Sequence, residues 1–416
     1  MPTNIKKMYK TISEEHFPQQ MEISFVNSGK KQTLYYDKVA WKIDGVSKGL
    51  RYGENPGQPA ALYKPVNGNL ILSNAETIAF GKYLVSDVRL LQSGKHPGKT
   101  NLTDADNALN ILRYLHDKPC AVIVKHNNPC GAAQDKTLSE AYQKAYMADR
   151  IAAFGGCIAL NRAVDKITAQ LIAEQYAEVV AAPEFEEGSF EILASRKNLR
   201  IIKIKNIADL ENFIGKPYID FKSLIDGGII AQIPFTPNIR SINKLKPAKT
   251  EYKGKTYAIK RKPTKKEAAD MLFGWLVEAG IASNSVIYVK NLTTVGIGTG
   301  EQDRVGVAEI ARDKAYKKLA DKYCYQNYKI SYNELENYDK KEEIKKRVEA
   351  ENGGLKDAAM VSDAFFPFTD GVKVGIKEKI SSVIQPGGAE NDRQVIEECN
   401  KAGVTMVFTG QRSFKH

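Results

Sequence analysis

The sequence predicts an α/β protein with two sheet-containing domains, and three observations carry this prediction. Short apolar, β-branched runs alternate along the chain with segments whose apolar residues follow helical spacing. The length of 416 residues is enough for two or three domains. Residues 233–262 contain three prolines and many lysines, which is typical of a boundary between domains. We therefore predict an N-terminal extension over 1–50, a first domain over 51–235 and a second domain over 236–416.

Composition indicates an ordinary globular protein, with 43% hydrophobic and 26% charged residues. No apolar stretch approaches the roughly 18 residues of a membrane span, and the N-terminus is polar, without the apolar core of a signal peptide. We expect a cytoplasmic protein without a membrane partner.

Five scattered cysteines lack the paired spacing of a disulfide framework or a structural zinc site.

The 61 Lys and Arg residues exceed the 49 Asp and Glu residues, which gives a net charge of +12. Such a charge suits nucleic acid, an anionic small substrate or a solvated basic surface. The chain has no nucleic-acid recognition motif, so an anionic small substrate is the favoured partner.

The predicted elements of the first half begin with an irregular loop over 51–59, where Gly53, Pro56, Gly57 and Pro59 interrupt regular structure. A helix follows, with Asn101 and Thr103 placed to cap it. Residues 121–124 predict a buried parallel strand that ends in a turn at 127–131. A helix at 138–150, a strand region broken by Gly155 and Gly156, a further helix and strand, and apolar runs at 200–204 and 227–232 complete this half.

The second half opens with a predicted capping box, in which Thr264 precedes Glu267 by three residues at the start of a long helix. Residues 283–320 predict a strand, a turn, a strand, a glycine-rich turn and a helix. A charged helical segment covers 321–356, and a strand, a glycine turn, a helix and a last strand lead to the C-terminus. No internal repeat is evident.

Lys125 and His126 directly follow the apolar run 121–124 and are the leading chemical candidates. Ligands of open α/β sheets bind beyond the carboxyl ends of strands. A histidine there can accept a proton while the neighbouring lysine donates one or stabilises negative charge. A surface lysine beside a hydrogen-bonded histidine is the simpler alternative for this pair taken alone.

Other motifs argue against common cofactor chemistries. The glycines at 296–300 are mis-spaced for a dinucleotide fingerprint, and no P-loop occurs. His126 and Cys130 lack the remaining residues of a zinc deaminase signature, so zinc has no ligand set. Further polar clusters lie among apolar residues, and together they indicate a site built from several strand ends. They are Lys290 with Asn291, Asp303 with Arg304, Asp363 with three phenylalanines, and the C-terminal residues 412–416.

At these residues the chain closely resembles the transformylase domain of the bifunctional purine enzymes, which formylate 5-aminoimidazole-4-carboxamide ribonucleotide (AICAR) from 10-formyltetrahydrofolate. The matching stretches run in order from about residue 50 to 416: LRYGENP, VKHNNPCG, AFGG, VVAAP, KRKPT, SNSVIYVKN, IGTGEQDR, SDAFFPF, QPGG and the terminal R-x-F-x-H. The resemblance implies a zinc-free, cytidine-deaminase-like transformylase fold. It also implies a stand-alone transformylase without inosine monophosphate (IMP) cyclohydrolase activity, with a separate cyclohydrolase in the pathway.

The resemblance further implies residue roles. His126 would accept the proton of the substrate amine, Lys125 would stabilise or protonate the folate leaving nitrogen, and Asn291 would orient the histidine or the formyl group. Asp370 would help hold the folate. The implied nucleotide-binding and pocket-lining residues are Arg51, Tyr52, Asn101, Phe154, Gly155, Arg304, Phe365, Arg412, Phe414 and His416.

The family also implies a homodimer with active sites at its interface, and it allows a structural monovalent cation. Two departures from the family pattern stand out. Gly57 occupies a position where many relatives carry a histidine, and the QPGG loop continues as AEND, where relatives often carry a serine and an arginine. Two alternatives stay open: a basic protein that binds nucleic acid, and a related enzyme that uses another one-carbon donor, such as formate with ATP.

Overall fold

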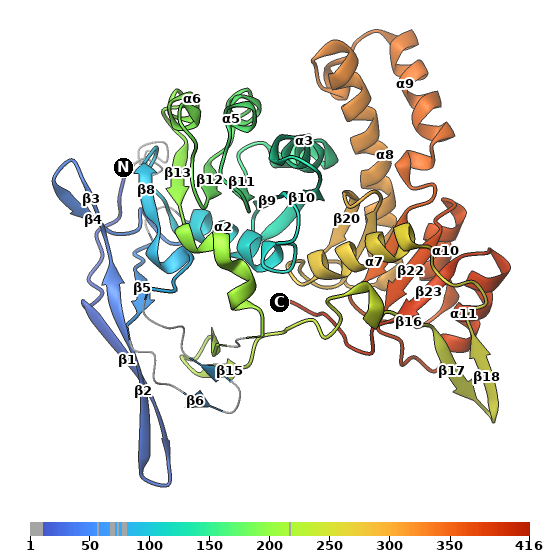
Figure 1. Cartoon of the computed structure of the whole chain (residues 1–416), viewed down its shortest axis with the longest axis horizontal. Coiled ribbons are helices and arrows are strands. Elements are labelled where there is room, and N and C mark those ends of the chain that lie inside the picture. Colours follow the sequence, from blue (N-terminus) through green and yellow to red (C-terminus); the bar gives the residue numbers. More distant parts are fainter. Residues whose placement is uncertain (1–10, 56–57, 67–70, 73–74, 77–80, 216–217) are drawn as a thin grey trace. The chain divides into compact units, whose positions relative to one another are not determined.

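The computed structural model describes residues 11–55, 58–66, 71–72, 75–76, 81–215 and 218–416 (Figure 1). Gly57 lies outside the described residues. The chain divides into two compact units, Met1–His116 with Gly155–Thr236, and Asp117–Phe154 with Pro237–His416. The predicted boundary at 235 lies beside the division at 236, whereas residues 117–154, which carry Lys125 and His126, group with the second unit. The assignment of three segments stays a prediction.

Two six-stranded mixed sheets with the same strand order form the framework, so the α/β prediction is confirmed. Each begins with an antiparallel hairpin, continues with three parallel strands and ends in an antiparallel edge strand. The first sheet runs β10 (Asn128–Gln134), β9 (Cys120–Lys125), β11 (Cys157–Leu160), β12 (Val179–Ala182), β13 (Arg200–Lys203), β8 (Arg89–Gln92). The second runs β20 (Thr294–Thr299), β19 (Ser285–Val289), β21 (Ala359–Ser362), β22 (Ser382–Gln385), β23 (Thr405–Phe408), β16 (Lys246–Pro247).

The shared order is an internal repeat that the sequence did not reveal. Most strands of these sheets are only four to six residues long and largely buried, so many apolar sequences satisfy them equally well. The cytidine-deaminase-like assignment stays a prediction.

Helices occupy matching places in the two repeats. The first contains α2 (Lys99–Leu112), α3 (Leu138–Ala148), α4 (Arg150–Ala153), α5 (Lys166–Ala173) and α6 (Ser189–Ala194). The second contains α7 (Lys265–Glu278), α8 (Arg304–Tyr328), α9 (Tyr338–Ala350), α10 (Thr369–Lys377) and α11 (Asp392–Lys401). In each repeat one helix precedes the hairpin and the others separate the strands that follow.

The capping box at the start of α7 is confirmed. The Glu267 amide donates to Thr264 Oγ1 (3.2 Å), and the Thr264 amide donates to a Glu267 carboxylate oxygen (2.8 Å). The predicted cap of α2 is wrong in detail, because the helix starts one turn earlier, with Gly98 as its N-cap. Asn101 is the third helical residue and accepts from the Gly98 amide (3.1 Å), whereas Thr103 lies inside the helix.

Smaller elements surround the two sheets. The described part of the predicted N-terminal extension is β-structure: β1 (Gln20–Asn27) and β2 (Lys30–Val39) pair with β5 (Leu62–Pro65), and β3 (Trp41–Ile43) pairs with β4 (Val46–Lys48). Three further two-stranded pairs are β6 (Ile71–Leu72) with β7 (Ala75–Glu76), β14 (Asp220–Ser223) with β15 (Ile229–Gln232), and β17 (Lys249–Tyr252) with β18 (Lys255–Ala258). The 3₁₀ turns are η1 (Val85–Asp87), η2 (Lys205–Phe213), η3 (Ile242–Lys244), η4 (Tyr332–Glu334) and η5 (Asn352–Gly354).

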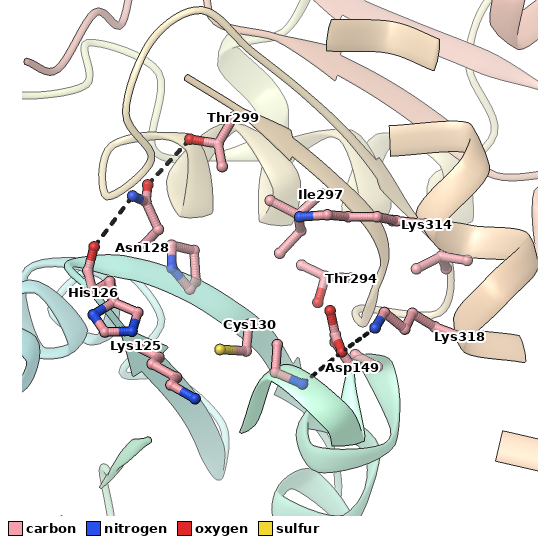
Figure 2. A pocket seen from close by; sticks show the side chains of 15 residues that line it. Lys125, His126, Asn128, Cys130, Asp149, Thr294, Ile297, Thr299, Lys314 and Lys318 are labelled. Atoms are coloured by element: carbon pink, nitrogen blue, oxygen red, sulfur yellow. Dashed lines mark hydrogen bonds and ion pairs between the residues drawn. The ribbon is translucent and has the colours of Figure 1, made fainter. Parts of the chain in front are cut away.

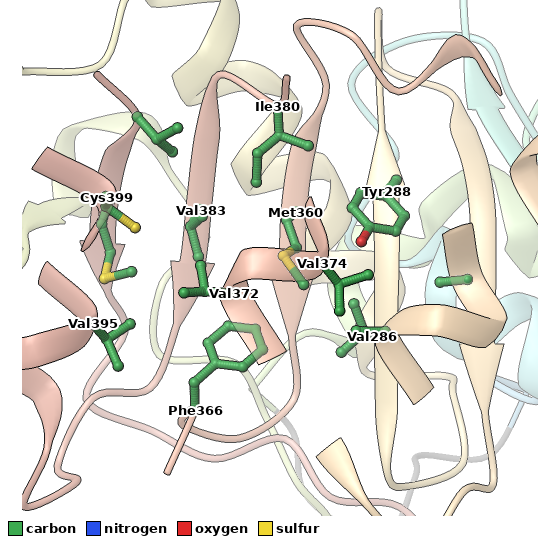
Figure 3. Packing of buried hydrophobic residues seen from close by; sticks show 14 of the residues in the cluster. Val286, Tyr288, Met360, Phe366, Val372, Val374, Ile380, Val383, Val395 and Cys399 are labelled. Atoms are coloured by element: carbon green, nitrogen blue, oxygen red, sulfur yellow. The ribbon is translucent and has the colours of Figure 1, made fainter. Parts of the chain in front are cut away.

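The core of the second unit lies between its sheet and the helices that cover it (Figure 3). Tyr288, Met360 and Val383, from β19, β21 and β22, belong to one buried cluster with Val372 of α10 and with Phe366. All five side chains are fully buried, and burying an apolar side chain of this size contributes about 1.5–3 kcal/mol. This core fixes the sheet on which the hairpin β19–β20 is built. Within the described parts of the chain, no helix combines the length and apolar character needed to cross a membrane.

Candidate functional site

Lys125 and His126 lie at the turn of the hairpin β9–β10. Lys125 pairs with Asn128, and the two residues between them have positive φ, 54° for His126 and 60° for Asn127. This is the backbone of a two-residue primed turn, which matches the twist of the flanking strands. The predicted turn is therefore present, but His126 and Asn127 form it, and residues 128–131 already belong to β10. The chain returns at once as an antiparallel strand, and the strand register shifts between Pro129 and Gly131.

The turn is held by three contacts from distant parts of the sequence. Asn128 Oδ1 accepts from the Ala282 amide (2.9 Å) and from Thr299 Oγ1 (3.2 Å), as Figure 2 shows for Thr299. Lys415 Nζ donates to the carbonyl of Asn127 (3.2 Å). Lys415 belongs to the predicted terminal cluster 412–416, but the motif R-x-F-x-H assigns roles only to its neighbours.

The Lys125 ammonium is fixed as well. Its Nζ donates to the carbonyl of Phe154 (2.8 Å), which directly follows α4. Arg150, the first residue of α4, forms a fork to the Asp321 carboxylate through Nε (3.0 Å) and Nη2 (3.1 Å). Asp321 is only 3% exposed in its side chain and Arg150 16%, so this ion pair is largely shielded from water. The position of Lys125 therefore depends in part on an ion pair to α8.

A hollow of about 150 Å³ lies beside the turn (Figure 2). Three lysines, Lys125, Lys314 and Lys318, line it together with one carboxylate, Asp149. Asp149 pairs with Lys318 (2.9 Å) and caps α4 by accepting from the Ala152 amide (2.9 Å). The excess of positive charge favours an anionic ligand. The volume is below the roughly 300–1,000 Å³ of small-molecule pockets, so it suits one end of a substrate. Its other lining residues are His126, Asn128, Pro129, Cys130, Ala148, Ala152, Thr294, Val295, Gly296, Ile297 and Thr299.

Asn291 occupies the matching turn of the second hairpin, β19–β20. Asn291 and Leu292 both have φ of 55°, and their amides donate to the carboxylate of Asp270 (3.1 and 2.7 Å). Burial raises the pKa of Asp270, and the two N–H donors oppose this shift. Asn291 lines a second hollow of about 310 Å³, not the one beside His126. The two hollows share Ala148, Thr294, Val295 and Lys318.

Arg304 is the first residue of α8 and is nearly buried. Its guanidinium donates to the Asp363 carboxylate, to Ser362 Oγ (3.1 Å), to the Ser285 carbonyl (3.0 Å) and to Asn284 Oδ1 (2.8 Å). A phosphate at Arg304 would have to replace or share one of these acceptors.

The C-terminal segment lies against the same region. The Ser413 amide donates to the Asp363 carbonyl (2.9 Å), and the guanidinium of Arg412 stacks 4.1 Å from the ring centre of Phe414. Phe414 also meets the His416 ring edge to face, at 5.8 Å. Together with the Lys415 contact to Asn127, these interactions bring the predicted terminal residues toward the Lys-His turn. Phe154, Phe365 and Asp370 are exposed on the second unit.

In the first unit, the predicted residues Arg51, Tyr52 and Asn101 meet at the start of α2. The Arg51 amide donates to the Pro97 carbonyl (3.0 Å), and the Lys99 amide donates to the Tyr52 carbonyl (3.0 Å). All three predicted side chains are buried. Gly155 has φ of +75° and donates its amide to the Tyr176 carbonyl (2.8 Å).

Arg200 is a charged residue of the first unit that sequence reasoning missed. It is fully buried and contacts Glu178 Oε2 (3.3 Å), which also accepts from Asn101 Nδ2 (3.0 Å). Burial lowers the pKa of Arg200, and Glu178 opposes the shift. Its sequence context, an apolar strand, gave no signal of an ionised group.

Among the described residues, no group of three or more His, Cys, Asp or Glu side chains is arranged to hold a metal ion. The five cysteines are free thiols, and four of them are buried. The absence of zinc and the structural monovalent cation both stay predictions.

The chain matches the protein-family model described as "AICARFT/IMPCHase bienzyme" over residues 8–314. It is 36% identical over 369 residues to "Bifunctional purine biosynthesis protein PurH" of Chlorobaculum parvum, covering 88% of this chain and 59% of that protein. The protein of the same name from Thermoanaerobacter sp. is 35% identical over 388 residues, covering 93% of this chain and 62% of the relative. The protein of the same name from Acetivibrio thermocellus is 33% identical over 413 residues, covering 99% of this chain and 64% of that relative. The chain thus spans about three fifths of the length of these relatives.

Proposed function

The chain belongs to the AICARFT/IMPCHase bienzyme family, and from this premise we propose that it transfers a formyl group from 10-formyltetrahydrofolate to the 5-amino group of AICAR. The observation that carries the proposal is the Lys125–His126 turn, which holds a base and an ammonium side by side at a basic hollow. The products are formyl-AICAR and tetrahydrofolate, in purine biosynthesis.

The reaction needs a proton acceptor. The substrate amine is a weak nucleophile, because the neighbouring carboxamide withdraws its electrons. As its nitrogen attacks the formyl carbon, the amine proton passes to His126, since an imidazole exchanges protons readily near neutral pH. The exposed side chain of His126 is open to such a reactant.

The reaction also needs a proton donor. The bond between the formyl carbon and the folate nitrogen breaks, and that nitrogen takes a proton, which the ammonium of Lys125 supplies. One of the three ammonium N–H groups is bound to the Phe154 carbonyl, which leaves two for the reactants. Asn291 is proposed to orient the formyl group or the histidine, which requires the bound substrate to reach the second hollow.

Binding roles follow the same proposal. Arginines suit the phosphate of a nucleotide, because their planar donors match its oxygens. We assign nucleotide contacts to Arg51, Tyr52, Asn101, Arg304, Arg412 and His416, pocket-lining roles to Phe154, Gly155, Phe365 and Phe414, and folate binding to Asp370.

We propose a homodimer with active sites at its interface. Exposed apolar side chains support self-association: Ile225 and Ile229, at and beside the turn of β14–β15, are 108% and 66% exposed. Light scattering at several protein concentrations tests this point, and a monomer at all concentrations contradicts it.

The test of function is release of tetrahydrofolate from the two substrates by wild type, His126→Ala and Lys125→Ala. General acid–base groups contribute about 10²–10⁴-fold, so each variant should lose that much in kcat with its circular dichroism spectrum unchanged. Lys317→Ala, an exposed lysine of α8, is the matched control and should keep full activity. If the protein is active only with formate and ATP, the formyl donor proposed here is wrong. If it binds DNA or RNA but neither substrate, the proposed function is wrong.

A further inference from the structure

Four lysines line the second hollow, which we call the lysine hollow: Lys144 of α3, Lys290 before the β19–β20 turn, and Lys318 and Lys322 of α8. Glu351 is the one carboxylate among its lining residues. We propose that the lysine hollow binds a compact polyanion, a molecule with two or more adjacent phosphate or carboxylate groups. Asn291, to which formyl transfer assigns a role, also lines this hollow, but the proposed polyanion contacts the lysines and its binding is tested without the substrates of formyl transfer.

Three of the four lysines are positioned by partners that do not line the hollow. Lys144 forms an ion pair with Asp135, and Lys318 pairs with Asp149 (2.9 Å). Lys290 Nζ donates to the carbonyl of Lys356 (2.6 Å). These contacts hold the ammonium groups in place before any ligand arrives, which lowers the entropic cost of binding.

Lys322 differs from the other three. Its ammonium makes no hydrogen bond or ion pair to any residue that the structure describes, although the side chain is partly buried. Burial lowers the pKa of Lys322, and the nearby ammonium of Lys144 lowers it further, whereas Glu351 opposes both effects. A desolvated cation without a partner is costly, and an anion in the hollow would remove that cost.

Glu351 does not already serve as this anion. Both of its carboxylate oxygens accept from the Tyr323 hydroxyl (2.7 Å each), and one accepts from Arg347 Nε (3.3 Å). Burial and Glu351 raise the pKa of Tyr323 to about 12, so the phenol stays a neutral donor. The carboxylate is therefore already hydrogen-bonded by Tyr323 and Arg347, and the lining residues, four lysines against one carboxylate, keep an excess of positive charge.

The dimensions and walls of the hollow also fit a small polyanion. Its volume of about 310 Å³ lies at the lower end of ligand pockets, roughly 300–1,000 Å³. Ammonium groups act as compact point charges that favour multiply charged oxygen ligands. Phosphate and carboxylate chains share this chemistry, and separate probes distinguish them.

The experiment is isothermal titration of the whole protein, without substrates, using inorganic tripolyphosphate and citrate as probes. We expect saturable binding of at least one probe, weakened about tenfold in Lys322→Met and kept in Lys322→Arg. Lys317→Met, on the exposed face of the same helix, should bind within twofold of wild type.

Any result other than this pattern overturns the proposal. One such outcome is that wild type binds neither probe at millimolar concentration. Another is that Lys317→Met weakens binding as much as Lys322→Met, which would indicate attraction to the basic surface alone. Lys144→Met provides a second variant should Lys322→Met fail to fold, and unchanged binding in it would also count against the hollow. Formyl transfer is measured separately, so failure of one proposal leaves the other in place.

Discussion

Replacing Gly131 with alanine tests how the hairpin that carries Lys125 and His126 is positioned. A Cβ at residue 131 would lie 2.0 Å from the carbonyl oxygen of Ala145 in α3, whereas real Cβ contacts do not come below 3.0 Å. Helix and strand must therefore separate by about 1 Å. Overpacking costs typically about 1–3 kcal/mol. We expect a loss near 3 kcal/mol in the free energy of unfolding, because the atom met is backbone and cannot rotate away.

The same substitution should lower formyl transfer. A misplacement of about 1 Å in a catalytic group can reduce the rate about 10²-fold, so kcat should fall by that order while the variant is still folded. Urea unfolding gives the stability, and tetrahydrofolate release gives the rate. Gly49→Ala is the control, since its Cβ would meet nothing within 4 Å. If the free energy of unfolding of Gly131→Ala lies within about 0.5 kcal/mol of wild type and its kcat within twofold, the close approach of Gly131 to α3 does not position the hairpin.

Three further predictions concern other parts of the fold. Gly296→Ala, in the matching hairpin, should cost as much stability as Gly131→Ala, because its Cβ would lie 2.2 Å from the Ala311 carbonyl; a cost below 1 kcal/mol speaks against equivalent packing. Asp321→Ala leaves the Arg150 guanidinium without its carboxylate and should cost about 3 kcal/mol, with much of it recovered in a double mutant with Arg150→Met; additive losses would exclude coupling. Burial raises the pKa of the Glu278 carboxyl well above its ordinary value, so the folded protein favours the protonated form. The free energy of unfolding is therefore highest below about pH 4.3, the ordinary pKa of glutamate, and falls as the pH rises from there toward the pKa of Glu278 in the folded protein. Glu278→Gln should therefore gain stability relative to wild type between about pH 5 and 8, and a pH-independent difference contradicts this assignment.

Local signals in the sequence predicted the elements that depend on local chemistry. The capping box of Thr264 and Glu267 satisfies the free amides at the start of α7, and both residues lie within one helical turn. The β19–β20 hairpin and α8 followed from apolar periodicity and the glycines between them. The elements of the α/β framework were therefore largely predictable.

The turn after the 121–124 strand was predicted, but its position at His126 and Asn127 was not, because its conformation is set from outside the segment. His126 and Asn127 adopt positive φ without a glycine, so the usual sequence signal of a primed turn is absent. Contacts from Ala282, Thr299 and Lys415, each more than 150 residues away, hold it. Pro129 and Gly131 are typical turn residues, but here they lie in β10. The strand register shifts between them, and Gly131 allows the strand to approach α3 closely.

Local sequence patterns also could not predict which charged residues are buried. Arg150 meets Asp321 across 171 residues, and Glu278 lies within an apolar helix, where Ser285 Oγ donates to it (3.0 Å). The repeat of the two sheets was hidden because strands of interchangeable apolar residues keep the topology while their sequences diverge. Site residues could be proposed from motif resemblance, but not their contacts.

We propose that this chain moves a formyl group to AICAR through the Lys125–His126 turn. The most direct measurement is mass spectrometry of the nucleotide after incubation with 10-formyltetrahydrofolate carrying a ¹³C-labelled formyl group. We predict labelled formyl-AICAR in a one-to-one ratio with tetrahydrofolate for wild type, and neither product from His126→Ala over the same time. Unlabelled AICAR alone with the wild-type protein, or equal labelling by His126→Ala, would contradict the claim.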